Sequence, residues 1–177
     1  MMKVEISSAD PALTNQRRAR MVSEYQLGRV LQRASRQAER GGYLGCVVLA
    51  RVVPPPSLQN EVEGQQRQME EAASALASLG RESNFFSRLS CRPDEFGFLV
   101  KHLGVRTDGR LFCERVEAFE LSQGYRLRTG IALYPLQGLR CHMLWMIARQ
   151  DLEMNQGEVE LSSHHIPNDT LPVKRRA

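Results

Sequence analysis

Hydrophobic and polar positions change their spacing several times along the chain. The first periodic segment predicts a helix from about residue 15 to residue 41, because its apolar residues recur at helical intervals. Its expected apolar side is formed by Val22, Tyr25, Leu31 and Ala38. The run 43–53 is apolar apart from Arg51, and its valines favour a strand covered on both faces. Three consecutive prolines then end this strand.

The remaining segments alternate between the spacing of apolar residues typical of helices and the spacing typical of strands. Three helices are expected, over 65–79, 111–121 and 139–154. Four strands are expected: a hairpin of 84–91 and 96–100, a strand over 125–134 and an edge strand over 157–162. Residues 92–95 supply the turn of the hairpin. An antiparallel hairpin among mixed helices and strands indicates an α+β domain rather than a doubly wound fold.

This pattern divides the chain into three parts. Residues 1–42 form an N-terminal arm and an arginine-rich helix, 43–162 form the α+β domain, and 163–177 form a polar tail expected to be disordered. No run approaches the roughly 18 apolar residues of a membrane helix, so no membrane span is expected. The N-terminus is polar and shows no signal peptide, which favours the cytoplasm.

Charge and cysteine content narrow the candidate chemistry. The net charge of +4 favours an anionic partner but is too small to indicate nucleic acid, for which no binding motif is present. The cysteines Cys46, Cys91, Cys113 and Cys141 are scattered, without metal-ligand spacing. They are expected to be free thiols, and no metal or other cofactor is expected. The spacing marks no nucleophile–base pair for covalent catalysis.

Four strings, in order along the chain, carry a resemblance. They are Asp10–Arg18, Asn60–Gly64, the hairpin string Arg92-Pro93-Asp94-Glu95-Phe96, and the strand Thr129-Gly130-Ile131-Ala132-Leu133-Tyr134-Pro135. Together they resemble the GGDEF domain of diguanylate cyclases, whose signature lies at a hairpin tip. The resemblance implies the nucleotidyl-cyclase-like fold of that family, an antiparallel-containing central sheet with flanking helices.

The catalytic groups that the resemblance implies are missing. The family condenses two GTP molecules on divalent metal held by carboxylates, one of them at the end of the first core strand. This chain has Arg51 there and no acid between Glu39 and Glu61. Arg92 and Pro93 replace the two glycines of the signature, which removes a backbone donor and close access for a nucleotide. We therefore expect no catalytic residues, no metal site and no cyclase activity.

The contacts to phosphate, base and product are depleted too. The family's lysines are missing from the matching positions, and its inhibitory R-x-x-D motif is replaced by Ser83–Phe86. The residues still able to contact a ligand are Asn60, Arg88, Arg92, Asp94 and Glu95. For Asp94 and Glu95, simple tolerance by the turn is the competing interpretation.

Two functions follow from this combination. The first is a regulatory module that binds a protein partner in cyclic di-GMP-type signalling, and the alternative is a non-catalytic receptor for cyclic di-GMP or GTP. Arg29, Arg33, Arg36 and Arg40 share one helix face and are the candidate partner-binding residues, although a solvated helix face is the simpler interpretation. Trp145, Met143 and Met146 are expected in the core, with a partner groove as the alternative. A dimer is left open.

Overall fold

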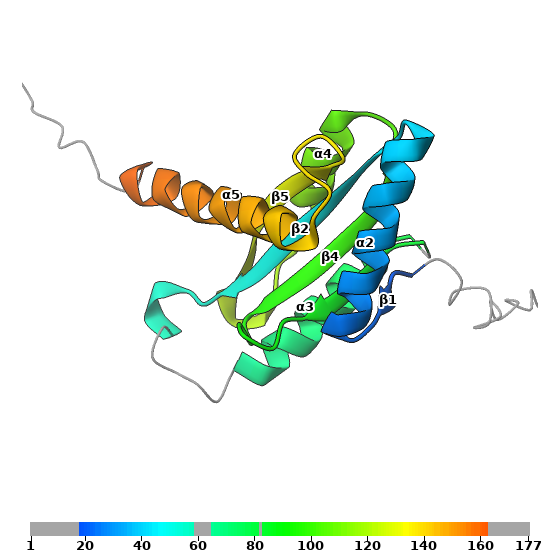
Figure 1. The fold of residues 1–177 in the computed structure, drawn as a ribbon. Coiled ribbons are helices and arrows are strands. Elements are labelled where there is room, and N and C mark those ends of the chain that lie inside the picture. The colour runs from blue at the N-terminus through cyan, green and yellow to red at the C-terminus, as the bar shows by residue number, and fades with distance from the viewer. Residues whose placement is uncertain (1–17, 59–64, 82, 163–177) are drawn as a thin grey trace, which may run out of the picture.

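A computed structural model describes residues 18–58, 65–81 and 83–162. Its five strands form one mixed sheet in the order β1-β3-β4-β2-β5 (Figure 1). The strands are β1 Arg20–Met21, β2 Leu44–Val53, β3 Phe85–Arg88, β4 Glu95–Leu103 and β5 Arg126–Tyr134. The helices are α2 Glu24–Gly41, α3 Gln65–Leu79, α4 Arg106–Glu117 and α5 Cys141–Ser162, with short 3-10 turns at Pro56–Leu58 and Ser122–Gly124.

Strand β2 lies inside the sheet and is antiparallel to both of its neighbours, β4 and β5. Its side chains alternate between two hydrophobic clusters, with Val48 in one and Val47 in the other. Helices α3 and α4 cover the first cluster, and α2 and α5 cover the second (Figure 1). The expected α+β architecture and the two-sided burial of this strand are confirmed.

The hairpin is also confirmed. Strands β3 and β4 pair antiparallel, and the backbone N–H of Glu95 donates to the Arg92 carbonyl oxygen over 2.9 Å to close the turn. Helix α3 has the predicted bounds. The arm 1–17, Asn60 and the tail 163–177 lie outside the described residues.

The N-terminal helix begins later than predicted. Residues Arg20–Met21 instead form β1, which pairs parallel with β3. Helix α2 starts after Ser23, whose hydroxyl accepts from the Gln26 backbone N–H at 3.3 Å, while the Gln26 side chain accepts from the Ser23 backbone N–H. Its buried side consists of Leu27, Leu31, Ala34, Ser35 and Ala38. The prediction for Tyr25 was wrong: its side chain is exposed and lies under the Arg29 guanidinium.

The C-terminal part differs most from the expectation. The predicted edge strand over 157–162 is wrong, because α5 continues as a helix to Ser162. The predicted burial of Met143 and Met146 is also wrong, because the buried face of α5 follows Leu144, Ala148 and Leu152. None of the helices in the described segments is apolar over enough residues to traverse a bilayer.

Candidate functional site

The tip of the β3–β4 hairpin lies against the end of β2. The backbone N–H of Val52 in β2 donates to the Asp94 carbonyl oxygen over 2.9 Å, and the Leu89 N–H donates to the Glu95 carbonyl oxygen over 3.0 Å. In the register of the sheet, Arg51 of β2 is the direct partner of Glu95. The residue expected at the metal position and the last acid of the signature are therefore cross-strand neighbours.

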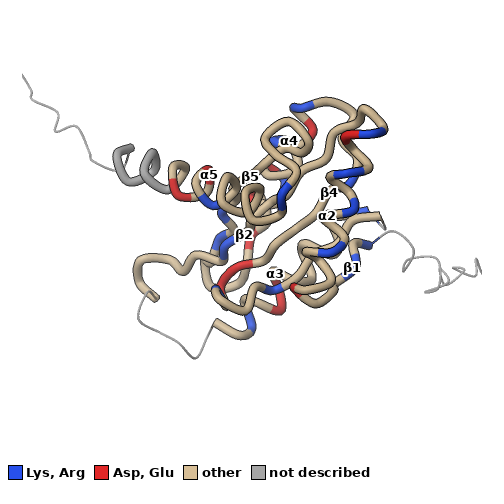
Figure 2. Tube along the Cα trace, viewed as in Figure 1, with Lys and Arg blue, Asp and Glu red and all other residues tan. Residues whose placement is uncertain are grey.

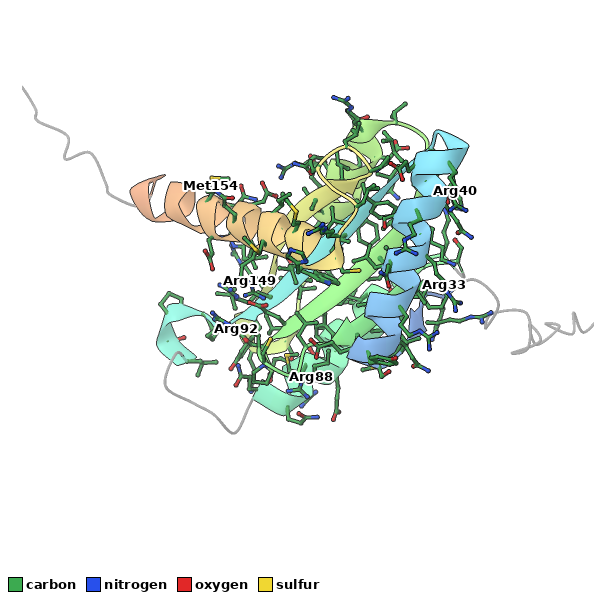
Figure 3. All side chains as sticks on the ribbon, in the orientation of Figure 1. Arg33, Arg40, Arg88, Arg92, Arg149 and Met154 are labelled. Atoms are coloured by element: carbon green, nitrogen blue, oxygen red, sulfur yellow. The ribbon has the colours of Figure 1, made fainter. Side chains whose placement is uncertain are left out.

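The Glu95 carboxylate is fully buried and paired on both oxygens. Arg51 donates to its Oε1 from Nε at 2.9 Å and from Nη2 at 2.6 Å. Arg149, on α5, donates from Nη1 to Oε1 at 3.0 Å and from Nη2 to Oε2 at 2.7 Å. We call Arg51, Glu95 and Arg149 the arginine–glutamate triad. It joins β2, β4 and α5 at one end of the sheet, where Figure 3 labels Arg149 near the hairpin.

The triad fixes the charge state of its members. Burial acts to raise the pKa of Glu95, but the hydrogen bonds and charges of Arg149 and Arg51 outweigh it and lower that pKa. The hydrogen bond to Glu95 in turn raises the pKa of Arg149. The carboxylate is therefore ionised at neutral pH, with guanidinium donors on both of its oxygens.

These side chains do not fit a divalent cation. Such a cation needs carboxylate oxygens that are free to coordinate it, whereas both oxygens of Glu95 already accept from guanidinium groups and Arg51 also lies 3.9 Å from the Asp94 carboxylate. Across the described part of the chain, no group of three or more His, Cys, Asp or Glu side chains could hold a metal ion. Positive charge from the protein occupies the place where the resemblance implies a metal.

The other predicted ligand residues are distributed around the tip. Arg88 donates from Nε to the Pro93 carbonyl oxygen over 2.9 Å and from Nη1 to the Gln66 side chain over 3.2 Å, so it braces the turn. Arg92 is exposed and Asp94 is half-buried. The structure therefore brings Arg88, Arg92 and Asp94 to the same end of the sheet, where Figure 3 labels the two arginines.

A second feature is a groove between α2 and the start of α5. It encloses about 890 Å³. Its charged lining residues are Arg29, Arg36, Glu39, Arg40 and Arg140, and His142 lines it too. We call this surface the arginine groove. Figure 2 shows the concentration of basic residues along α2. Of the predicted partner-binding residues, Arg33 is exposed but does not line the groove.

A third feature is a cavity of about 350 Å³ beside the start of β3. Its lining includes Ser83 and Asn84, at the place of the missing inhibitory motif, together with Arg81, His102 and Arg115. Arg115 comes from α4, which also lines the cavity with Asp108, Leu111 and Phe112. Arg81 and Arg115 come from segments distant in sequence. Both line the cavity at the place where the R-x-x-D motif of the GGDEF family would supply an arginine.

Sequence reasoning missed Arg149, Arg140 and Arg115. Each comes from an element distant in sequence from the residues it joins, and no local spacing links them.

Comparisons with known proteins agree with this geometry. No protein-family model and no curated protein matches the sequence. Among solved structures, the GGDEF domain of YfiN (also called TpbB) from Pseudomonas aeruginosa is 21% identical, with a TM-score of 0.64 over 77% of this chain and 91% of that chain. The GGDEF domain of FimX from the same organism is 16% identical, with a TM-score of 0.62 over 86% and 96%.

Two further neighbours were solved with ligands or partners. The GGDEF domain of DgcB from Caulobacter crescentus, in complex with c-di-GMP, is 15% identical and has a TM-score of 0.61 over 90% of this chain and 92% of that chain. The diguanylate cyclase SiaD from Pseudomonas aeruginosa, in complex with its activator SiaC, is 16% identical with a TM-score of 0.62 over 77% and 55%. The sheet order, the hairpin and these neighbours together show that this chain has the fold of a GGDEF domain.

Proposed function

We propose that this chain is a catalytically inactive GGDEF-like module that regulates cyclic di-GMP-type signalling in the cytoplasm by binding a protein partner. The observation that carries the proposal is the arginine–glutamate triad. A reaction between two triphosphates needs divalent cations to neutralise charge and activate the attacking hydroxyl. Here, guanidinium groups occupy both oxygens of Glu95, and one of them stands on the strand expected to hold the metal.

Guanidinium charge does not replace the metal in this reaction. Arg51 and Arg149 could attract phosphate, but neither can activate a hydroxyl, because arginine stays protonated in proteins. Both guanidinium groups are already committed to Glu95. The loss of a metal contribution corresponds to several powers of ten in rate.

Turnover of GTP tests the catalytic half of the proposal. The protein is incubated with GTP and Mg²⁺, and the products are separated by chromatography beside an active diguanylate cyclase. We expect no cyclic di-GMP above the background of a protein-free sample. Product formation that scales with protein concentration would contradict the proposal.

The arginine groove is the surface that we assign to the partner. Four arginines line it against one glutamate, so it favours an acidic segment that can form bidentate carboxylate contacts. The complex of SiaD with its activator SiaC is a precedent for protein regulation on this fold. The helix face carrying Arg29, Arg36 and Arg40 would then be a binding surface rather than only a solvated one.

Charge reversal within one helix tests this assignment. Affinity capture from the native cell extract is compared for the wild-type protein, Arg36→Glu in the groove, and Arg33→Glu as a control with the same charge change outside it. We expect one specific partner to be retained by wild type and Arg33→Glu and lost from Arg36→Glu. Equal capture by both variants would place the partner elsewhere.

A second candidate function is a receptor for cyclic di-GMP or GTP. It is favoured by the cavity lined by Arg81 and Arg115, because two cations from different elements suit a phosphate-bearing ligand. Isothermal titration calorimetry with each nucleotide, on wild type and Arg115→Ala, decides this. Binding that weakens in Arg115→Ala would support the receptor, and absence of heat at high micromolar concentration would remove it.

A further inference from the structure

Strand β5 forms one edge of the sheet, and side chains rather than a strand occupy its outer side. Strand β2 pairs with the inner side of β5. Helices α4 and α5 contact β5 from opposite faces of the sheet (Figure 1). An isolated bridge from Glu120 reaches Arg126, the first residue of the strand. Beyond that bridge, no strand within the described segments pairs with this edge.

Three side chains accept hydrogen bonds from the backbone of β5. The pairs, with their N···O distances, are Thr129 with Glu117 Oε1 at 2.8 Å, Ile131 with Asp151 Oδ2 at 2.9 Å, and Leu133 with Gln137 Oε1 at 2.6 Å. We call Glu117, Gln137 and Asp151 the β5 caps. Alternate residues of a strand direct their N–H groups to the same side. The caps therefore occupy the donors that an added strand at this edge would use.

Two carbonyl groups of the same residues are occupied as well. The Leu133 carbonyl oxygen accepts from the Gln137 backbone N–H over 2.9 Å. The Thr129 carbonyl oxygen accepts from the Asn155 side chain over 3.4 Å. Gln137 thus fills both backbone groups of Leu133, as a residue of a neighbouring strand would do.

The capped edge lies close to solvent. Glu117 and Gln137 are exposed. A hollow of about 310 Å³ opens between α4 and α5, and its lining includes Ile131 and Leu133 of the edge together with the caps Gln137 and Asp151. Removal of the caps would therefore leave unpaired backbone donors within reach of another chain, which is the condition under which sheets join edge to edge.

The opposite edge of the sheet is protected in a different way. It is formed by β1, which has two residues. So short an edge offers little backbone for another strand to pair with. Strand β5 has nine residues, so it is the edge at which strand addition has to be prevented by other means.

From these contacts we propose that the β5 caps prevent two copies of this chain from pairing through their β5 edges. Two identical edges related by a two-fold axis would otherwise form one continuous antiparallel sheet. Partners are then recognised by side chains on the helices and not by strand addition. The caps lie outside the arginine groove, so the proposal stands or falls independently of the function proposed above.

Amide hydrogen exchange, followed by NMR, tests whether the caps protect the edge. Gln137→Ala removes the acceptor of the Leu133 N–H, whereas Gln137→Glu keeps an oxygen at that position. We expect the Leu133 amide to exchange about tenfold faster in Gln137→Ala and at nearly the wild-type rate in Gln137→Glu. Glu117→Ala and Glu117→Gln should differ in the same way at Thr129. Unchanged exchange in the alanine variants, or equal acceleration in the variants that keep the oxygen, would overturn the role of the caps.

The state of assembly tests what the caps prevent. Sedimentation equilibrium over a roughly hundredfold concentration range compares Glu117→Ala/Gln137→Ala/Asp151→Ala with Glu117→Gln/Gln137→Glu/Asp151→Asn, which keeps the acceptors. We expect the alanine variant, with a native circular dichroism spectrum, to gain molar mass with concentration, while the second variant keeps the wild-type molar mass. Wild-type molar mass for the alanine variant, or equal association of both variants, would refute the proposal.

A further control separates edge pairing from general destabilisation. Glu71→Ala also removes an acceptor from a backbone N–H, that of Ser122 at 2.8 Å, but in a 3-10 turn rather than on a strand. It should not associate, and association equal to that of the alanine variant would count against the edge. If the triple alanine variant does not fold, Glu117→Ala/Gln137→Ala takes its place, because both of its changes are at exposed side chains.

Discussion

Arg51 and Glu95 face each other across the antiparallel strands β2 and β4, and Nη2 of Arg51 lies 2.6 Å from Oε1 of Glu95. Arg149 closes the other side of the same carboxylate. Three elements distant in sequence thus meet at one fully buried acid, and the stability of this end of the sheet depends on it.

Removal of the Glu95 side chain should lower the free energy of unfolding. Glu95→Ala leaves two guanidinium groups close together without their acid, and breaking a buried pair in this way costs about 3–5 kcal/mol. Urea unfolding measures the change in free energy. Asp94→Ala is the matched control, because Asp94 is half-buried and lies 3.9 Å from Arg51, so its loss should cost less than about 1 kcal/mol. Equal losses would argue against the triad.

The triad also predicts how stability depends on pH. Since the folded-state pKa of Glu95 is lowered, its contribution is complete above the unfolded-state value of about 4.3 and is lost as pH falls through the folded-state value. Unfolding free energies of wild type and Glu95→Gln are compared from pH 7 downward. We expect the wild-type advantage to be largest near neutrality and to shrink below about pH 4. An advantage that does not change with pH would contradict the ionised triad.

A glycine on β5 should be essential for the packing of α5. A Cβ atom built on Gly130 would lie 2.1 Å from the carbonyl oxygen of Ala148 and 2.4 Å from the backbone nitrogen of Leu152. Because both atoms belong to backbone, Gly130→Ala must displace the helix, and we expect a loss of several kcal/mol in thermal or urea unfolding. Gly28→Ala, at an open position on α2, is the control and should not destabilise the protein.

The thiols should react in the order of their exposure. Cys91 is exposed, whereas Cys46 and Cys113 are buried, and burial raises the pKa of Cys113 to about 11. With a chromogenic disulfide reagent at neutral pH, Cys91 should react first. Cys46 and Cys113 should react only when denaturant is added. Rapid modification of Cys113 in the folded protein, located by mass spectrometry, would contradict the packing of α4 on the sheet.

Much of the fold could be predicted from the sequence because its signals are local. The helix Gln65–Leu79 and the strand Leu44–Val53 have regular apolar spacing and clear terminators, and both were located correctly. Strand β1 could not be found in this way, since two residues carry no period and their strand state depends on pairing with β3. Residues 157–162 alternate in polarity, yet they continue a helix already begun at Cys141.

The site was predictable in part. The hairpin string and the missing acid near Arg51 were visible in the sequence and located the triad's first two members. The third, Arg149, depends on how α5 crosses the sheet, and this is set by close backbone approach at Gly130. No pattern in the sequence specifies such a crossing. The same reason explains why Arg33 differs from Arg36: only the packing of α5 against α2 decides which arginines border a groove.

Because the hairpin tip is fastened by atoms of the chain itself, we expect it to have no loaded and empty forms. Glu95 is bonded to Arg51 and Arg149, so we expect the shape of the tip to be insensitive to chelators and to the cellular magnesium level. A protein that recognises this end of the domain therefore meets one constant surface. A change of state in this protein would therefore arise at another surface of the domain, through a bound partner or a change in assembly.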